Sequence, residues 1–294
     1  MDFKKITVAG SGVLGAQIAF QTAFHGFDVI VYDISDEALS KLQKTFDRLK
    51  QAYQEDLNAS PEKVEQAEAR ISTTTDLTEA VKDADLVVES VPENVDIKTD
   101  FYQKLGKVAP EKTVFATNSS TLLPSMFAEA TGRPEKFLAL HFANEIWKHN
   151  TAEIMGHEGT SKEPYDAVVA FAKAIGMVAI PLDKEQPRYV VNTLLVSLLD
   201  AGLELWAKEV AVVETIDKTW MLGTGAPMGP FAMMDVISVT TVYSIYKIKT
   251  EKSQDPVHKK IFKKLKDMVD EEKLGTTTGQ GFYSYPDPAF QQKD

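Results

Sequence analysis

Short apolar runs rich in β-branched residues alternate with amphipathic stretches in the first part of the chain. This alternation is typical of parallel strands that are joined by crossover helices. Six of the runs are expected to form strands, and these are Lys5–Ala9, Asp28–Tyr32, Asp85–Ser90, Thr113–Thr117, Phe137–His141 and Thr151–Met155. The pattern therefore predicts an α/β fold with a doubly wound, mainly parallel sheet.

Two stretches of helical periodicity, 35–55 and 60–70, lie between the second and third predicted strands and predict an antiparallel helical hairpin. After Pro181 the strand pattern stops, and four long helices are expected at Tyr189–Trp206, Val213–Leu222, Phe231–Lys249 and Val257–Val269. We therefore expect two domains, an α/β domain over residues 1–183 and an all-α domain over residues 184–294. The apolar faces of the later helices exceed what a small bundle buries, which favours a homodimer that forms through this domain.

The composition excludes several kinds of partner and chemistry. The chain has 43 acidic and 32 basic residues, and its formal charge of −11 disfavours binding to nucleic acids and anionic membranes. The absence of cysteine excludes disulfides, thiolate metal ligands and thiol nucleophiles. No apolar run approaches the roughly 20 residues of a membrane span, and no targeting segment precedes the first predicted strand. We expect a cytoplasmic protein that acts on a small molecule.

A glycine-rich segment follows the first predicted strand and opens a helix. Gly10 permits a tight turn, Gly12 lets the backbone approach a pyrophosphate, and Gly15 lets the helix pack on the strand. The second strand runs up to Asp33, where a carboxylate would accept hydrogen bonds from the ribose hydroxyls of a dinucleotide. The next residues include acidic ones at 36–37 instead of a cation for a 2′-phosphate. The segment therefore predicts a Rossmann-type domain that binds NAD.

Among the five histidines, His141 is the best candidate for acid–base chemistry. It ends an apolar strand at the carboxyl edge of the predicted sheet, where open α/β sheets bind their ligands. Glu153, in the next predicted strand, could hold one imidazole nitrogen so that the other faces a substrate. A hydrogen-bonded core histidine and a surface carboxylate would give the same pattern, so both interpretations stay open here. His149 and His157 continue a spacing of eight, but no acidic or thiol partners share a ligand-like spacing, and no metal is predicted.

Nearly the whole chain resembles the 3-hydroxyacyl-CoA dehydrogenase family. Besides the glycine segment, the resemblance lies in Thr117–Thr121, His141–Asn144, Gly225–Phe231 and Gly279–Tyr283, which occur in the same order. It implies a Rossmann NAD-binding domain followed by a helical domain that binds substrate and dimerises. It also implies an NAD-dependent enzyme of fatty acid metabolism that moves a hydride reversibly between NAD and the 3-hydroxy or 3-keto carbon of an L-3-hydroxyacyl-CoA.

The resemblance also implies roles for single residues. His141 would be the general acid and base, with Glu153 as its orienting partner. Ser120 and Asn192 would hydrogen-bond the reacting oxygen, which gains negative charge during hydride transfer and so needs donors aimed at it. The glycine segment and the resemblance together give the expected cofactor contacts, which are Gly10, Gly12, Val13, Leu14, Gly15, Asp33, Glu93, Lys98, Asn118 and Asn144.

The chain departs from the family pattern at positions that bear on the substrate. Ala143 and Glu145 stand where the family has phenylalanine and proline, and Thr277 stands where it has a lysine. The stretch 53–56 offers carboxylates where the family hairpin carries a lysine for the coenzyme A arm, although Lys41, Lys44, Arg48 and Lys50 lie close by in the sequence.

Two further functions stay open. One is a ketoreductase for small β-keto or β,δ-diketo esters, like the diketoreductase branch of the family, which 12–26 and 141–144 also resemble. The other is an NAD-binding sensor or structural protein that has kept the fold and lost the chemistry, because a fold alone does not establish an activity.

Overall fold

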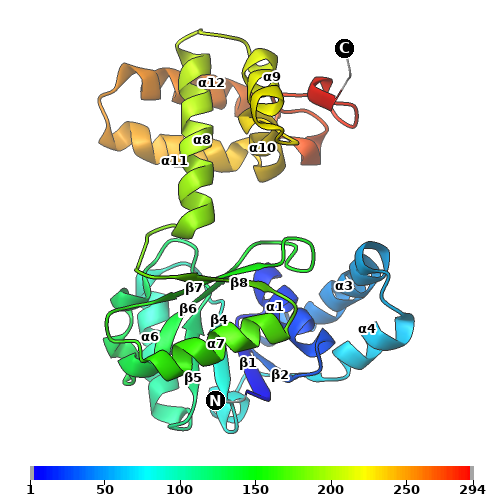
Figure 1. Cartoon of the computed structure of the whole chain (residues 1–294), viewed down its shortest axis with the longest axis vertical. Helices are drawn as coiled ribbons and strands as arrows, with labels where there is room; N and C mark the ends of the chain where they lie inside the picture. Colours follow the sequence, from blue (N-terminus) through cyan, green and yellow to red (C-terminus); the bar gives the residue numbers. More distant parts are fainter. Residues whose placement is uncertain (1–2, 292–294) are drawn as a thin grey trace. The chain divides into compact units, whose positions relative to one another are not determined.

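The structure is a computed structural model that describes residues 3–291. These residues form two compact units, which divide after Val190 (Figure 1). The first unit is an α/β domain and the second is helical, which confirms the fold class that the sequence predicts. The sequence places the boundary after residue 183, directly behind the last strand, whereas the contacts group the following connection with the first unit.

The first unit is built on an eight-stranded sheet with the order β3-β2-β1-β4-β5-β6-β7-β8. Its strands are β1 (Lys5–Ala9), β2 (Asp28–Tyr32), β3 (Ile71–Thr74), β4 (Leu86–Glu89), β5 (Val114–Thr117), β6 (Phe137–Phe142), β7 (Thr151–Gly156) and β8 (Val178–Leu182). All neighbouring strands are parallel except β6 and β7. The six predicted strands are confirmed. The sequence pattern misses β3 and β8 because both are edge strands with half-exposed side chains, which carry no fully buried apolar run.

Helices cover both faces of the sheet (Figure 1). They are α1 (Val13–Phe24), α2 (Asp36–Ser40), α3 (Leu42–Leu57), α4 (Pro61–Glu68), α5 (Leu77–Val81), α6 (Val95–Val108) and α7 (Lys162–Ala174). The first predicted stretch of the hairpin corresponds to α2 and α3, and the second corresponds to α4. An ion-pair cluster at Lys50 joins α3 to α4. The Lys50 Nζ atom lies 3.1 Å from a carboxylate oxygen of Glu65 and 2.6 Å from one of Glu68, so the ammonium of α3 binds two carboxylates of α4.

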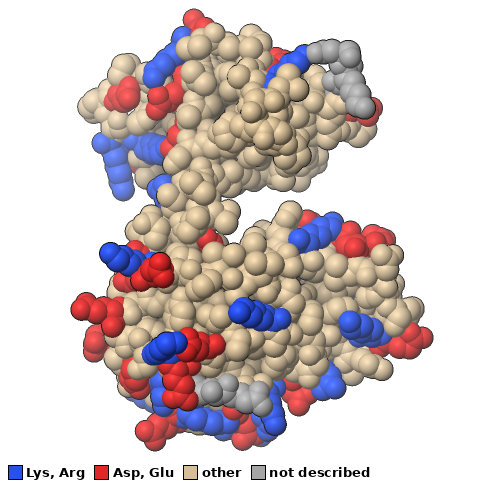
Figure 2. Space-filling model, viewed as in Figure 1, with Lys and Arg blue, Asp and Glu red and all other residues tan. Residues whose placement is uncertain are grey.

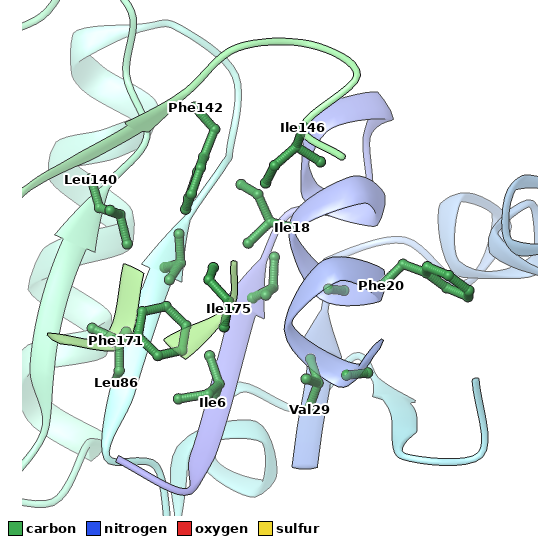
Figure 3. Close-up of a cluster of buried hydrophobic side chains, with 14 of the residues drawn as sticks. Ile6, Ile18, Phe20, Val29, Leu86, Leu140, Phe142, Ile146, Phe171 and Ile175 are labelled. Atoms are coloured by element: carbon green, nitrogen blue, oxygen red, sulfur yellow. The ribbon is translucent and has the colours of Figure 1, made fainter. Parts of the chain in front are cut away.

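The core of the first unit lies between the sheet and the helices that cover it. Figure 3 shows part of it: Ile18 of α1 and Phe171 of α7 pack in one cluster with Ile6, Leu86 and Leu140 of the strands. The central strands are apolar because helices cover both faces of the sheet. This packing brings the carboxyl ends of β1, β4, β5 and β6 to one edge, where a ligand of an open α/β sheet binds.

The second unit contains five α-helices among the described residues. They are α8 (Tyr189–Ala207), α9 (Val213–Thr224), α10 (Pro230–Ile237), α11 (Val239–Lys252) and α12 (Pro256–Asp270), and α8 starts two residues inside the first unit. The predicted single helix Phe231–Lys249 is wrong, because the chain breaks at Ser238, whose φ is +90°. The break is not visible in the sequence, since both halves continue one apolar pattern. Within residues 3–291, α8 alone is long and apolar enough to cross a membrane, and core helices pass the same test. Leu199 and Leu203 of α8 are buried in the core of the second unit.

A buried aspartate explains one glycine-rich motif of the second unit. The carboxylate of Asp217 accepts hydrogen bonds from the backbone N–H groups of Phe231 and Ala232, at 3.0 and 2.9 Å, and from the Tyr283 hydroxyl at 3.0 Å. A side chain at Gly229 would overlap Asp217. The motif around Gly229 therefore holds the start of α10 on α9.

A second buried aspartate does the same for the terminal motif. The carboxylate of Asp235 accepts hydrogen bonds from the backbone N–H groups of Phe282 and Tyr283, at 2.8 and 2.9 Å, and from the Tyr285 hydroxyl at 3.0 Å. A Cβ atom at Gly281 would overlap this carboxylate. Asp235 thus holds the terminal motif on α10 of the helical unit.

We expect Asp235→Asn to lower the free energy of unfolding by about 2 to 3 kcal/mol, because the asparagine amide group would face buried donors that have no other partner. Urea unfolding followed by circular dichroism measures this change. The exposed Asp267→Asn is the matched control and should stay within about 0.5 kcal/mol of the parent. A loss in Asp235→Asn no larger than in this control would show that Asp235 does not hold the terminal segment.

Candidate active site

The pairing of β6 with β7 brings the predicted acid–base residues together. His141 and Glu153 are direct partners in this antiparallel ladder, and His141 Nδ1 lies 3.1 Å from Glu153 Oε2. The other ring nitrogen, Nε2, lies 3.1 Å from the hydroxyl oxygen of Ser120. Both partners are buried, with 7% of His141 and 3% of Glu153 exposed. His141, Glu153 and Ser120 therefore form one connected site at the carboxyl edge of the sheet.

The hydrogen bonds define which imidazole nitrogen is available for chemistry. A carboxylate can only accept, so Nδ1 carries the proton that faces Glu153. Glu153 is itself oriented, because its Oε1 atom accepts a hydrogen bond from the backbone N–H of Val190 at 2.9 Å. In the neutral ring, Nε2 is then left as the acceptor, which is the form that can take a proton from a hydroxyl group.

The fourth predicted catalytic residue, Asn192, lies on α8 in the second unit. Of the two predicted asparagines near the cofactor, Asn118 is buried, and its side-chain oxygen accepts a hydrogen bond from the backbone N–H of Phe142 at 3.0 Å. This bond ties the end of β5 to the end of β6, beside His141. Asn144 is exposed in the loop that follows β6.

The glycine segment has the geometry of a phosphate cradle. Gly10 has a φ of +107°, and a Cβ atom there would overlap the backbone that follows β4. A Cβ atom at Gly15 would overlap the carbonyl of Gly10, so this glycine lets α1 pack closely. A Cβ atom at Gly12 would meet no protein atom within 4 Å, and no side chain caps α1 here. No side chain therefore competes for the N–H groups at the start of α1, including those of Val13 and Leu14, where the sequence predicts the phosphate contact.

Asp33 lies directly beside this cradle. Its Oδ2 atom accepts hydrogen bonds from the backbone N–H and the hydroxyl of Ser11, at 2.9 and 2.7 Å, and its Oδ1 atom accepts one from the backbone N–H of Ser35 at 3.1 Å. The carboxylate is thus fixed at the carboxyl end of β2, where the predicted ribose contact would be.

Glu93 and Lys98 belong to a network of hydrogen bonds and ion pairs near the carboxyl ends of β4 and β5. Glu93 Oε1 accepts hydrogen bonds from the Ser119 hydroxyl at 2.5 Å and from the Thr121 backbone N–H and hydroxyl at 3.0 and 2.8 Å. Burial alone would raise the pKa of Glu93, but these donors and the Lys98 ammonium outweigh it and lower the pKa. Lys98 itself is buried and lies 2.5 Å from Glu89 and 3.4 Å from Glu93, so its charge is shared between two carboxylates.

Glu89 is a residue of this site that the sequence analysis misses. It ends β4 and is fully buried, and besides Lys98 it accepts hydrogen bonds from the Tyr102 hydroxyl at 2.9 Å and the Thr117 hydroxyl at 2.8 Å. The available signal is a glutamate that closes a strand of otherwise apolar residues. Such a carboxylate must find buried partners, and here they come from α6 and β5.

The loop after β6, residues 143–150, is held by two other elements of the first unit. On one side, the side-chain oxygen of Gln17 in α1 accepts hydrogen bonds from the backbone N–H groups of Glu145 at 2.9 Å and Ile146 at 3.4 Å. Glu145 has a φ of +56°, a conformation that this anchoring helps to keep. The loop that begins two residues after His141 is thereby attached to the helix behind the phosphate cradle.

On the other side, the loop contacts the end of α3. The carboxylate of Asp56 accepts a hydrogen bond from the Trp147 indole at 2.8 Å and lies 3.0 Å from the Lys148 ammonium. Hydrogen bonds from Trp147 and then Lys148 lower the pKa of Asp56. The Trp147 ring also packs on Tyr53, with 5.4 Å between ring centres. The acidic end of α3 therefore serves to bind this loop.

Known proteins match this chain over almost its full length. The family models described as 3-hydroxyacyl-CoA dehydrogenase, NAD binding domain and C-terminal domain match residues 5–186 and 189–285. The mitochondrial hydroxyacyl-coenzyme A dehydrogenase of Homo sapiens is 35% identical over 96% of this chain and 91% of its own length. A probable 3-hydroxybutyryl-CoA dehydrogenase of Bacillus subtilis is 32% identical over 97% of this chain and 98% of its own length.

Solved structures agree with these matches. A diketoreductase studied for its catalysis of dicarbonyl compounds is 51% identical, with a TM-score of 0.92 over 97% of this chain and 100% of that one. The (S)-3-hydroxybutyryl-CoA dehydrogenase of Ralstonia eutropha is 27% identical, with a TM-score of 0.83 over the same shares of the two chains. The chain therefore belongs to the 3-hydroxyacyl-CoA dehydrogenase family and is an NAD-dependent oxidoreductase that acts on a hydroxyl-bearing carbon.

Proposed function

We propose that this chain moves a hydride reversibly between NAD and the 3-hydroxy or 3-keto carbon of an L-3-hydroxyacyl-CoA. The observation that carries this proposal is the buried His141, which lies between Glu153 and Ser120 at the edge of the sheet that also holds the phosphate cradle. Bound NAD accepts the hydride during oxidation and supplies it during reduction. The remaining task of the protein is to orient the substrate oxygen and to move its proton.

In the oxidation direction, His141 Nε2 removes the proton of the 3-hydroxyl group while the hydride leaves the same carbon. The imidazolium that forms keeps its Nδ1–H hydrogen bond to Glu153, whose negative charge stabilises the imidazolium. The Ser120 hydroxyl, which lies 3.1 Å from Nε2, binds the same substrate oxygen, with Asn192 as a second donor in our proposal. In the reduction direction, the His141 imidazolium returns the proton to the new alkoxide.

In our proposal, three groups of residues bind the pyrophosphate, the adenosine ribose and the nicotinamide end of NAD. The N–H groups at the start of α1 bind the pyrophosphate, and Asp33 binds the adenosine ribose. Glu93, Asn118 and Asn144 line the nicotinamide end, and Lys98 acts there through the two carboxylates that it holds. The acidic residues that follow Asp33 would repel a 2′-phosphate, which supports NAD over NADP.

A second substrate class, small β-keto or β,δ-diketo esters, is favoured by two observations. The Lys50 ammonium is bound to carboxylates of α4, so it is not free to receive a phosphate-bearing arm. The nearby end of α3 offers the Asp56 carboxylate, which is bound to the loop after β6 and cannot bind a phosphate. The chain also shares 51% identity with a diketoreductase.

We propose further that the protein is cytoplasmic and forms a homodimer through the helical unit. This unit exposes large apolar side chains on its helices, among them Leu194, Val236 and Ile248. On the first unit, the face in Figure 2 shows basic and acidic side chains interspersed, without a continuous basic surface for a polyanion.

Sedimentation equilibrium at micromolar concentration tests the dimer. We expect twice the mass of the 32.5 kDa chain. Leu194→Lys together with Ile248→Glu should shift the protein toward the monomer, because charges would be buried at the proposed contact. A parent protein that sediments as a monomer would contradict this proposal.

His141→Ala is expected to lower kcat by at least about a hundredfold, because general acid–base catalysis contributes typically 10² to 10⁴ in rate. The affinity for NADH, measured by fluorescence titration, should change less than about threefold. His258→Ala, which removes a histidine on α12, is the control. A loss in His141→Ala of less than about tenfold, roughly 1.4 kcal/mol, would rule out the assigned role.

The substrate class is tested by the absorbance of NADH with acetoacetyl-CoA in one reaction and ethyl acetoacetate in another, each repeated with NADPH. We expect fast oxidation of NADH with the CoA ester and little oxidation of NADPH. Comparable rates with both esters would favour the small-ester class. Binding of NADH without turnover of any β-keto compound would instead indicate the sensor or structural role.

A further inference from the structure

One face of the His141 imidazole is covered by an aromatic ring. The rings of His141 and Tyr189 are nearly parallel, at 11°, with 4.3 Å between their centres. Tyr189 is 1% exposed, so the stacked pair excludes water from that face. A stacked tyrosine can affect the histidine beyond packing, because the electron-rich face of an aromatic ring attracts a cation.

The start of α8 also contacts Glu153 and the neighbour of Ser120, the two hydrogen-bonding partners of His141. The Tyr189 hydroxyl donates a hydrogen bond to the backbone carbonyl of Ser119 at 2.8 Å, in the segment that carries Ser120. The next residue, Val190, donates its backbone N–H to Glu153 at 2.9 Å. Residues 189–190 therefore touch the ring, the segment that carries the hydroxyl partner, and the carboxylate.

The backbone that presents Tyr189 is in an unusual conformation. Arg188 and Tyr189 have φ values of +68° and +54°, in the left-handed region that residues with a side chain rarely adopt. Two such residues in succession persist only where surrounding contacts hold them. The stack on His141 and the bond to Ser119 are such contacts, so the connection into α8 is shaped by its position at the site.

We propose that Tyr189 is a positioning residue of the hydride-transfer site, whose ring face stabilises the His141 imidazolium and whose hydroxyl fixes the segment of Ser119 and Ser120. This inference rests on the proposed function of His141. In oxidation the imidazolium is formed, and in reduction it is the proton donor, so the same ring face assists both directions.

The charged groups around this pair are acidic. Glu153 of β7 contacts the imidazole directly, and the carboxylates of Glu89, Glu93 and Glu185 act on Tyr189 from further away. Burial, followed by the charge of Glu153, raises the pKa of Tyr189 far above its usual range. The phenol thus stays neutral and keeps the proton that it donates in its hydrogen bond to the Ser119 carbonyl.

The test compares Tyr189→Phe, which keeps the ring and loses the hydroxyl, with Tyr189→Leu and Tyr189→Met, which lose both. The pH dependence of kcat/KM is measured for 3-hydroxybutyryl-CoA oxidation and for acetoacetyl-CoA reduction. Without the ring face the imidazolium is less stable, so the acid limb of oxidation and the alkaline limb of reduction should both move to lower pH, by about 0.5. In Tyr189→Phe both limbs should stay in place, while kcat falls by about two- to threefold as Ser120 loses its support.

Tyr243→Leu is the matched control, because Tyr243 stacks on Phe262 within the helical unit, at 5.2 Å between ring centres. The protonation of His141 is also followed directly by NMR in each variant, which gives the same comparison without turnover. The ring-face role is overturned if the pH limbs and the NMR transition stay in place in Tyr189→Leu or Tyr189→Met. It is also overturned if they move as far in Tyr189→Phe as in these two variants. Absence of turnover in the parent protein would instead count against the proposed function, while the NMR comparison still decides the role of Tyr189.

Discussion

The site depends on one pairing in the sheet, the antiparallel ladder of β6 and β7 that places Glu153 opposite His141. A buried imidazole beside a buried carboxylate is favourable only if each has a partner, and here each partners the other. The pairing fixes the ring orientation and leaves Nε2 toward Ser120. Because β6 runs parallel to β5, the histidine emerges at the edge where the phosphate cradle also lies.

Carboxylates organise irregular segments in both units. In the first unit, Glu89 joins β4, β5 and α6, and Glu93 holds the segment that follows β5. In the helical unit, Asp217 and Asp235 bind backbone N–H groups of the two glycine-rich motifs. In each case a carboxylate with several donors fixes irregular backbone, which apolar packing alone would leave less defined.

The sequence predicts those features that are encoded locally. The glycine segment with Asp33 predicts the cofactor site, because the glycines and the aspartate lie within one strand–helix–strand stretch of the sequence. The hairpin and the six inner strands follow from periodicity, whereas the exposed edge strands and the break at Ser238 leave no such signal. The role of Tyr189 escapes the sequence, because its partner Ser119 lies 70 residues away. In the same way, nothing local shows that Asp56 binds Trp147, which lies 91 residues away.

The most direct test of the account is a double-mutant cycle on His141 and Glu153, measured as kcat with saturating NADH. If Glu153 acts by orienting the imidazole and stabilising its charge, Glu153→Gln should cost about a hundredfold or more in the parent. The same change should cost almost nothing when His141 is already alanine. Equal losses in both backgrounds would contradict the account, because Glu153 would then act independently of the histidine.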